Sequence, residues 1–247
     1  MSVDSARVFL TADWRHLVML NYVIDPDLLK PLVPTGTELD FWQGRAYVSM
    51  VGFRFLNTRV LGISIPFHRD FEEINLRFYV QRKAEDGSWR RAVVFIKEIV
   101  PRFAIAFVAR TIYNEPYIAL PTSHHIEHSA EAEQIKSATY SWQFKGGSHF
   151  IKVNTRNEPK AMIAGSEAEF IAEHYWGYTA QRDGSTLEYR VEHPRWRVWD
   201  SASAEFSCDV GALYGQQYHD FLNCPPASAF LAEGSVVKVY QGIKISN

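Results

Sequence analysis

Apolar and polar residues alternate along most of this chain with the period of two that β-strands produce. In residues 74–81 every second position is apolar, so the polar side chains gather on the opposite face. Those polar residues are Asn75, Arg77, Tyr79 and Gln81. The pattern predicts a strand that turns one face to an apolar core and leaves a polar face to line a site.

Three short turn sequences, at 85–88, 145–148 and 182–185, separate pairs of such segments. Each contains Asp-Gly or Gly-Gly, which supplies the positive φ that a tight turn between antiparallel strands requires. The predicted hairpins join 72–83 to 89–100, 138–144 to 149–156, and 174–181 to 186–193. Further strands are predicted at 15–23, 37–42, 45–56, 102–113, 196–208 and 235–245.

Helix signals are few. Asp25 and Pro26 can begin a short helix that runs to Leu29. Ser166 and Glu169 have the spacing of a capping box. Residues 210–222 place apolar side chains on one half of a helix that ends at Asn223. The sequence therefore predicts a mainly β (α+β) protein with a few peripheral helices.

No linker, low-complexity tract or internal repeat divides the chain, so residues 1–247 are expected to form one domain. An antiparallel sheet with this many strands must close or fold over to hide its edges. We therefore predict a barrel or a strongly coiled sheet.

Composition agrees with a globular class. Of 247 residues, 47% are hydrophobic and 14% aromatic, which is ample for a core and excludes a disordered chain. The formal net charge is −2, whereas a protein that neutralises phosphates normally carries a basic excess, so we expect no nucleic-acid partner.

The chain shows no basic, then apolar, N-terminal pattern of a secretory signal, and its apolar runs are strand-sized. The two cysteines, Cys208 and Cys224, lack metal-ligand spacing, and a free buried thiol is expected. These features favour a cytoplasmic protein without a membrane partner.

One further strand face is unusual. In residues 103–112, Ala104, Ala106 and Arg110 share a side, so that small side chains leave space beside a cation that suits a carboxylate. Arg77 is the second such cation. Alternatively, both arginines form structural ion pairs, and the candidate partners are Glu73, Glu98 and Glu115.

Three other groups are weaker leads. Lys97 and Glu98 interrupt an apolar run, and a buried lysine can form a Schiff base, although a lysine at a sheet edge or paired with a carboxylate is more common. His174 can act as an acid or base, or only seal one end of the sheet. The third group is a set of histidines, His124, His125 and His128. We interpret their stretch of the chain as a solvated loop, so no metal site is predicted.

Short motifs along nearly the whole chain resemble the uncharacterised DUF2071 (YqjF-like) family. They are WRHL at 14–17, NYxxDPxxL at 21–29, VP at 33–34, FEEINLRFYV at 71–80, the run from 93 to 117, EHPxW at 192–196 and PxSAF at 226–230. That family is similar to the acetoacetate decarboxylase-like superfamily, which implies a coiled antiparallel sheet closed into a cone-shaped barrel. Because oligomers are common in that superfamily, the resemblance also implies a homo-oligomer, although no interface is identifiable.

The resemblance also bears on the chemistry. Acetoacetate decarboxylases carry two adjacent lysines, one of which forms a Schiff base, where this chain has Tyr117 and Ile118. Thr111 stands where the superfamily has a glutamate. Neither Tyr nor Ile can form an imine, so decarboxylation by that mechanism is disfavoured unless Lys97 substitutes.

The sequence leads to a pocket inside the barrel for a small anionic or carbonyl-bearing metabolite, such as a keto acid. Arg77 and Arg110 would hold its carboxylate. Tyr79, Tyr113, Tyr117 and Glu115 would shape and polarise the site. In an enzyme of the lyase, isomerase or hydrolase type, Glu115 or His174 would carry the proton and Tyr117 would donate a hydrogen bond to an oxyanion. No cofactor is implied.

Two other hypotheses remain open. A non-catalytic ligand-binding or structural protein is suggested by the absence of both lysines. A protein–protein module is suggested by the aromatic content, and it requires Trp89, Trp142 and Trp199 to be exposed in one patch.

Overall fold

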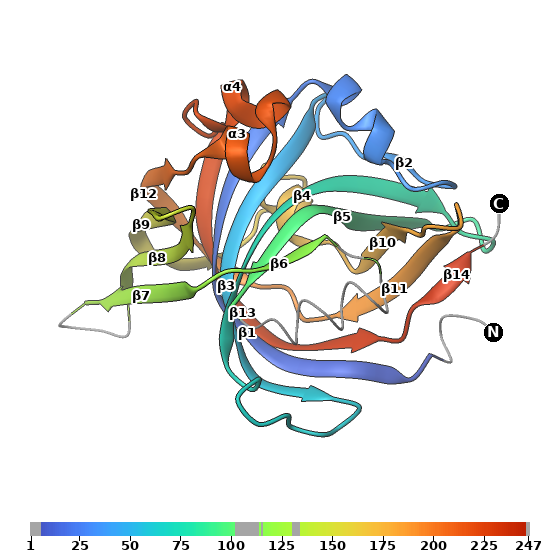
Figure 1. Ribbon diagram of the computed structural model, residues 1–247, viewed down its shortest axis with the longest axis horizontal. Helices are drawn as coiled ribbons and strands as arrows, with labels where there is room; N and C mark the ends of the chain where they lie inside the picture. The colour runs from blue at the N-terminus through green and yellow to red at the C-terminus, as the bar shows by residue number, and fades with distance from the viewer. Residues whose placement is uncertain (1–5, 102–113, 115, 130–133, 246–247) are drawn as a thin grey trace.

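Figure 1 shows the computed structural model of the chain, which describes residues 6–101, 114, 116–129 and 134–245. Strands dominate it. The strands are β1 Val8–Ile24, β2 Glu38–Leu39, β3 Ala46–Val60, β4 Phe71–Lys83, β5 Trp89–Val100, β6 Tyr117–Ala119, β7 Thr122–His128, β8 Ile135–Phe144, β9 Gly147–Ala161, β10 Trp176–Ala180, β11 Thr186–Glu192, β12 Arg197–Ser207, β13 Ser228–Tyr240 and β14 Ile243–Ile245. The helical elements are η2 Pro26–Leu28, η3 Lys30–Leu32, α2 Glu167–Ala172, α3 Val210–Leu213, η4 Gln216–Tyr218 and α4 His219–Leu222.

Seven strands close on themselves in a ring of backbone pairings. Their order is β11, β10, β5, β4, β3, β1 and β13, and β13 pairs again with β11 through Val191–Val239 and Glu192–Lys238. Closure removes the open edges that a long sheet would otherwise expose. The prediction of a closed, coiled sheet is therefore confirmed, although β10 and β5 pair in parallel rather than antiparallel.

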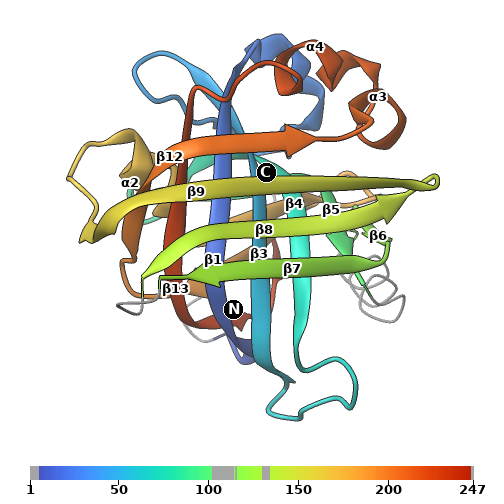
Figure 2. The same ribbon diagram turned by 90° about the vertical axis from the view of Figure 1, so that its left-hand side faces the viewer.

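A second layer of four strands covers the outside of the ring. The other half of β13 pairs with β12, and β9, β8 and β7 follow in order, so this sheet lies across β1 and β3 (Figures 1 and 2). Tyr140 and Trp142 of β8 are fully buried between the layers. Gly52 of β3 makes room, because a Cβ there would lie 2.9 Å from the ring of Tyr140.

The three predicted hairpins are confirmed as β4–β5, β8–β9 and β10–β11. The predicted strand at 102–113 lies outside the described residues. The interpretation of the histidine-rich stretch as a solvated loop is wrong, because His124, His125 and His128 belong to β7, which pairs with β8. The pattern was missed because only Ile126 is strongly apolar in this edge strand.

The helical predictions are confirmed in part. Ser166 caps α2 by accepting a hydrogen bond from the Glu169 backbone NH at 3.2 Å, and η2 follows Asp25 as expected. The helix predicted over 210–222 is broken into α3, η4 and α4. Gly215 breaks it, since its φ of 114° lies outside the helical range.

Two further expectations concern the cysteines and the membrane. Cys208 and Cys224 are both free as predicted, but neither is fully buried: Cys208 is half-buried and Cys224 is exposed. In the part of the chain that the structure describes, no helix is both long enough and apolar enough to cross a membrane.

Candidate functional site

A cavity of about 290 Å³ lies inside the ring of strands. Most of its wall is aromatic or aliphatic, and residues from nearly every strand of the ring contribute. Among the apolar lining residues are Trp14, Phe53, Phe55, Phe71, Phe95 and Trp196. Concave, mainly apolar cavities with a few polar groups are typical ligand sites, so the few polar groups of this wall are the candidates for ligand contacts.

Strand β4 supplies three polar groups to the wall, Glu73, Asn75 and Arg77. Alternation places them there, because the intervening residues face the core between the ring and the outer sheet. Glu73 is 3% exposed and accepts a hydrogen bond from Asn75 Nδ2 at 3.0 Å. The hydroxyl of Tyr117 also donates to Glu73, at 3.2 Å.

The register of the next strands adds a second carboxylate. Glu98 of β5 lies opposite Asn75 and beside Tyr117 of β6, and it is 1% exposed. Glu98 lines the same cavity. One stretch of wall therefore contains two buried carboxyl groups, an amide and a phenol.

Arg77 is the cation of this wall. It is half-buried, and its Nη2 donates to the carbonyl oxygen of Ile171 at 3.2 Å. It forms no ion pair with any residue that the structure describes, and the alternative that it pairs with Glu73 or Glu98 is therefore wrong. Its guanidinium has the charge to bind an anion within the cavity.

His174 lies between α2 and β10 and also lines the cavity. Its Nε2 is 3.5 Å from Arg91 Nη2 and 3.9 Å from Asp40 Oδ2. Burial lowers the pKa of His174 to about 4, and the positive charges of Arg91 and Arg77 act in the same direction, although Asp40 opposes them. The imidazole is therefore neutral near pH 7.

Tyr79 does not belong to the described lining residues. Its ring stacks on His174 with the ring centroids 4.6 Å apart, and its hydroxyl is 2.5 Å from Ser49 Oγ. Tyr79 thus helps to fix the orientation of the His174 ring by stacking on it. The other predicted site residues lie outside the described residues: Arg110, Tyr113 and Glu115, together with the Ala104 and Ala106 face.

Sequence reasoning placed Asn75 on the same strand face as Arg77, but it named neither Asn75 nor Glu73 nor His193 as a site residue, and all three line the cavity. The alternation that selected Arg77 places Glu73 and Asn75 on the same face, so this signal was present. His193 follows β11, and its ring stacks on Trp196 with centroids 4.2 Å apart. No periodicity marks it, because its position depends on the loop that leaves the strand.

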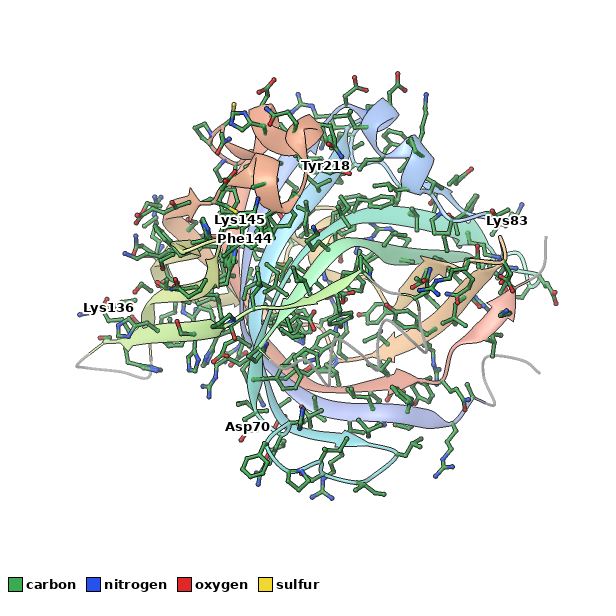
Figure 3. The ribbon with its side chains drawn as sticks, viewed as in Figure 1. Asp70, Lys83, Lys136, Phe144, Lys145 and Tyr218 are labelled. Carbon is green, nitrogen blue, oxygen red and sulfur yellow. The ribbon has the colours of Figure 1, made fainter. Side chains whose placement is uncertain are left out.

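None of the lysines lines the cavity. All nine lysines of the sequence lie within the described residues, and Lys83, Lys136 and Lys145 lie at strand ends or turns (Figure 3). Lys97 points to the opposite face of the ring, where its Nζ donates to the Leu213 carbonyl. Burial lowers the pKa of Lys97, but its amine is separated from the cavity by the sheet.

The remaining candidate sites are a metal centre and a patch of exposed tryptophans. Within the ranges that the structure describes, no group of three or more His, Cys, Asp or Glu side chains could hold a metal ion. Trp142 and Trp199 are buried, and Trp89 is 51% exposed. The exposed tryptophan patch that a protein–protein module required therefore does not form.

Comparison with known proteins agrees with this architecture. Residues 11–235 match the profile of DUF2071, described as uncharacterized conserved proteins. The uncharacterized protein YqjF of Bacillus subtilis (strain 168) is 32% identical over 216 residues, which cover 85% of this chain and 83% of that protein.

Solved structures of low sequence identity share the fold. Acetoacetate decarboxylase from Legionella pneumophila has a TM-score of 0.65 at 14% identity, over 96% of this chain and 87% of its own. The enduracididine biosynthesis enzyme MppR complexed with pyruvate has a TM-score of 0.68 at 10% identity, over 98% and 91%. An acetoacetate decarboxylase-like enzyme from Sphingomonas wittichii RW1 has a TM-score of 0.63 at 12% identity, over 97% and 94%.

Proposed function

The chain belongs to the DUF2071 family of uncharacterized conserved proteins, and we propose that its cavity binds a small carboxylate or keto acid. The observation that carries this proposal is Arg77, a half-buried cation in a mainly apolar wall that has no ion-pair partner among the described residues. A charge removed from water needs a partner, and a ligand carboxylate would supply a charge-assisted one. MppR, which shares the fold, is complexed with pyruvate, and this supports the same ligand class here.

The polar wall favours acid–base chemistry at a carbon beside a carbonyl. Glu73 and Glu98 are carboxyl groups that can accept a proton. Asn75 Nδ2 donates one of its two N–H groups to Glu73 and has a second one for a developing oxyanion, whereas Tyr117 would have to turn its single hydroxyl proton from Glu73 to the ligand. Imine chemistry has no support, because no lysine reaches the cavity. The proposed reaction class is therefore a lyase or isomerase type that proceeds through an enol or enolate. His174, Tyr117 and Glu115 remain the proton carriers and donors that the sequence predicts.

Binding is tested by isothermal titration with pyruvate and acetoacetate, using the wild type and Arg77→Met. We expect binding that the substitution weakens at least about tenfold, which corresponds to the loss of one charge-assisted hydrogen bond. Arg156→Met is the matched control, because Arg156 is exposed on the outer strand β9. Failure of both acids to bind, or equal affinity in Arg77→Met, would overturn the proposal.

Catalysis is separated from simple binding by proton exchange. If the site removes a proton next to the carbonyl, the methyl protons of pyruvate should exchange with D₂O faster in the presence of protein. Glu73→Gln should abolish that acceleration, because the amide cannot accept the proton. Tight binding without exchange in the wild type would instead favour the second candidate, a non-catalytic ligand-binding protein.

A further inference from the structure

The wall of the cavity changes from polar to aromatic along strand β4. On β4, Arg77 and Phe71 are six residues apart, which is about 20 Å along an extended strand. On the facing strand β3, Ser49 lies opposite Arg77 and Phe55 lies opposite Phe71. Along β4 the wall is therefore polar from Arg77 to Glu73 and aromatic at Phe71, although Phe95 of β5 also lies opposite Arg77.

The aromatic section is a continuous packed surface. Phe55 and Phe71 stack with ring centroids 4.7 Å apart and planes at 10°. Trp14 of β1 packs edge-on against Phe53 at 5.2 Å and against Phe55 at 5.6 Å. All four rings line the cavity, so this section offers apolar contact and few polar atoms.

The same section continues to the rim below it. Leu10 of β1 pairs with Val60 of β3 and Val239 of β13, and all three residues line the cavity. Beyond them the β3–β4 connection projects from the ring next to Asp70 (Figures 1 and 3). Ile65 of this loop lines the cavity and is 44% exposed, which makes it a residue of the rim.

We propose that the natural ligand is an amphipathic acid, whose carboxylate binds Arg77 and whose alkyl or aryl tail lies between Trp14, Phe55 and Phe71 toward Ile65. This inference rests on the proposed function and narrows its ligand class. The volume of about 290 Å³ has room for about ten water-sized groups, which is more than a three-carbon acid fills. A tail of several carbons would cover the aromatic surface and remove it from water.

The test is a homologous series of 2-oxo acids that differ only in tail length: pyruvate, 2-oxobutanoate, 2-oxohexanoate, 2-oxooctanoate and phenylpyruvate. Dissociation constants are measured by titration calorimetry at concentrations where the acids do not form micelles. We expect the affinity to rise about fourfold for each added methylene until the tail reaches the rim. Arg77→Met should weaken every member by a similar factor, since all share the carboxylate.

A matched pair of loop variants tests the direction of the tail. Ile65→Ser should reduce the gain of the longest acid about threefold and leave pyruvate unchanged. Ile63→Ser is the control, because Ile63 is 69% exposed in the same loop and lies outside the cavity lining. An unchanged affinity for long acids in Ile65→Ser would contradict this placement of the tail.

The outcomes distinguish two claims: that the ligand is amphipathic, and that the cavity binds a carboxylate at Arg77. Arg77-dependent binding of pyruvate with no gain along the series would overturn the amphipathic ligand and leave the proposed function intact. Binding of the long acids that is insensitive to Arg77→Met would overturn both, because the carboxylate anchor is common to them.

Discussion

The ring of Tyr189 on β11 lies against the backbone of Gly177 on the neighbouring strand β10. A Cβ on Gly177 would lie 2.2 Å from Cζ of Tyr189, closer than any non-bonded contact allows. The two residues are also paired across the strands. Because Tyr189 lines the cavity, the absence of a side chain at Gly177 determines where that part of the wall lies.

Gly177→Ala should therefore displace Tyr189 and destabilise the protein by about 1–3 kcal/mol, the usual cost of overpacking. Urea denaturation of the variant and the wild type measures the difference. In the double variant with Tyr189→Leu, the cost of the alanine should fall, because the ring that it meets is gone. Strictly additive effects of the two substitutions would contradict the contact.

The hairpins were predictable from sequence because their signals are local. Alternation defines each strand, and Asp-Gly or Gly-Gly fixes the turn between two neighbours, as in β4–β5 and β10–β11. Closure of the ring was foreseen only in general terms. The pairing of Val191 with Val239 joins residues that are far apart in the sequence, and nothing in either segment specifies the partner.

In the site, too, local alternation was predictable from the sequence, whereas features that depend on packing between strands were not. Alternation along β4 placed Arg77 and Asn75 on one face, and both residues line the cavity. The sequence also showed that Lys97 and Glu98 point to opposite faces, but not which one faces inward. That choice depends on a register shift between β4 and β5, next to the pair Leu76–Lys97, and such irregularities arise from packing across strands.

Lys97 supplies a test of the imine question. Borohydride treatment with pyruvate or acetoacetate should trap no adduct on the wild type, since the amine of Lys97 lies across the sheet from the cavity and donates to Leu213. Intact-mass spectrometry checks this. Lys97→Gln should bind the acids as the wild type does, with Lys83→Gln as the exposed control. A trapped adduct that Lys97→Gln abolishes would show that the lysine reaches the ligand.

Glu72 connects the outer sheet to the ring. Its carboxylate accepts hydrogen bonds from His124 Nδ1 at 2.5 Å and from Thr122 Oγ1 at 2.8 Å, both on β7. The hydrogen bond from His124 lowers the pKa of Glu72 below its ordinary value of 4.5. The carboxylate therefore stabilises the fold fully above pH 4.5, and this contribution is lost as the pH falls below that value.

Glu72→Gln should accordingly lower the free energy of unfolding by about 1–2 kcal/mol near pH 7. The difference from the wild type should shrink as the pH falls below 4.5, because the wild-type carboxyl is then protonated too. Denaturation curves at several pH values measure both effects. Glu85→Gln, in an exposed turn, is the control and should cost little at any pH.

His174 is held in its neutral form, whereas Glu72 is held in its charged form. The imidazole is buried among charged groups. Asp40 and Arg91 contact its Nε2, and Arg77 adds a second positive charge. Its pKa is about 4 in the folded protein and 6.5 without these surroundings. Between these values the unfolded chain binds the proton and the folded chain does not, so stability is complete above pH 6.5 and declines as the pH falls.

The expected loss from His174 is on the order of 3 kcal/mol between pH 6.5 and pH 4. His174→Gln cannot take up this proton, so its stability should decline less steeply over that interval. His16, whose pKa burial also lowers to about 4, should leave a residual slope in the variant. The exposed His125→Gln should keep the full wild-type slope. If His174→Gln also keeps that slope, the imidazole is not held neutral by its surroundings, and the charges of Arg91 and Arg77 do not act on it as described.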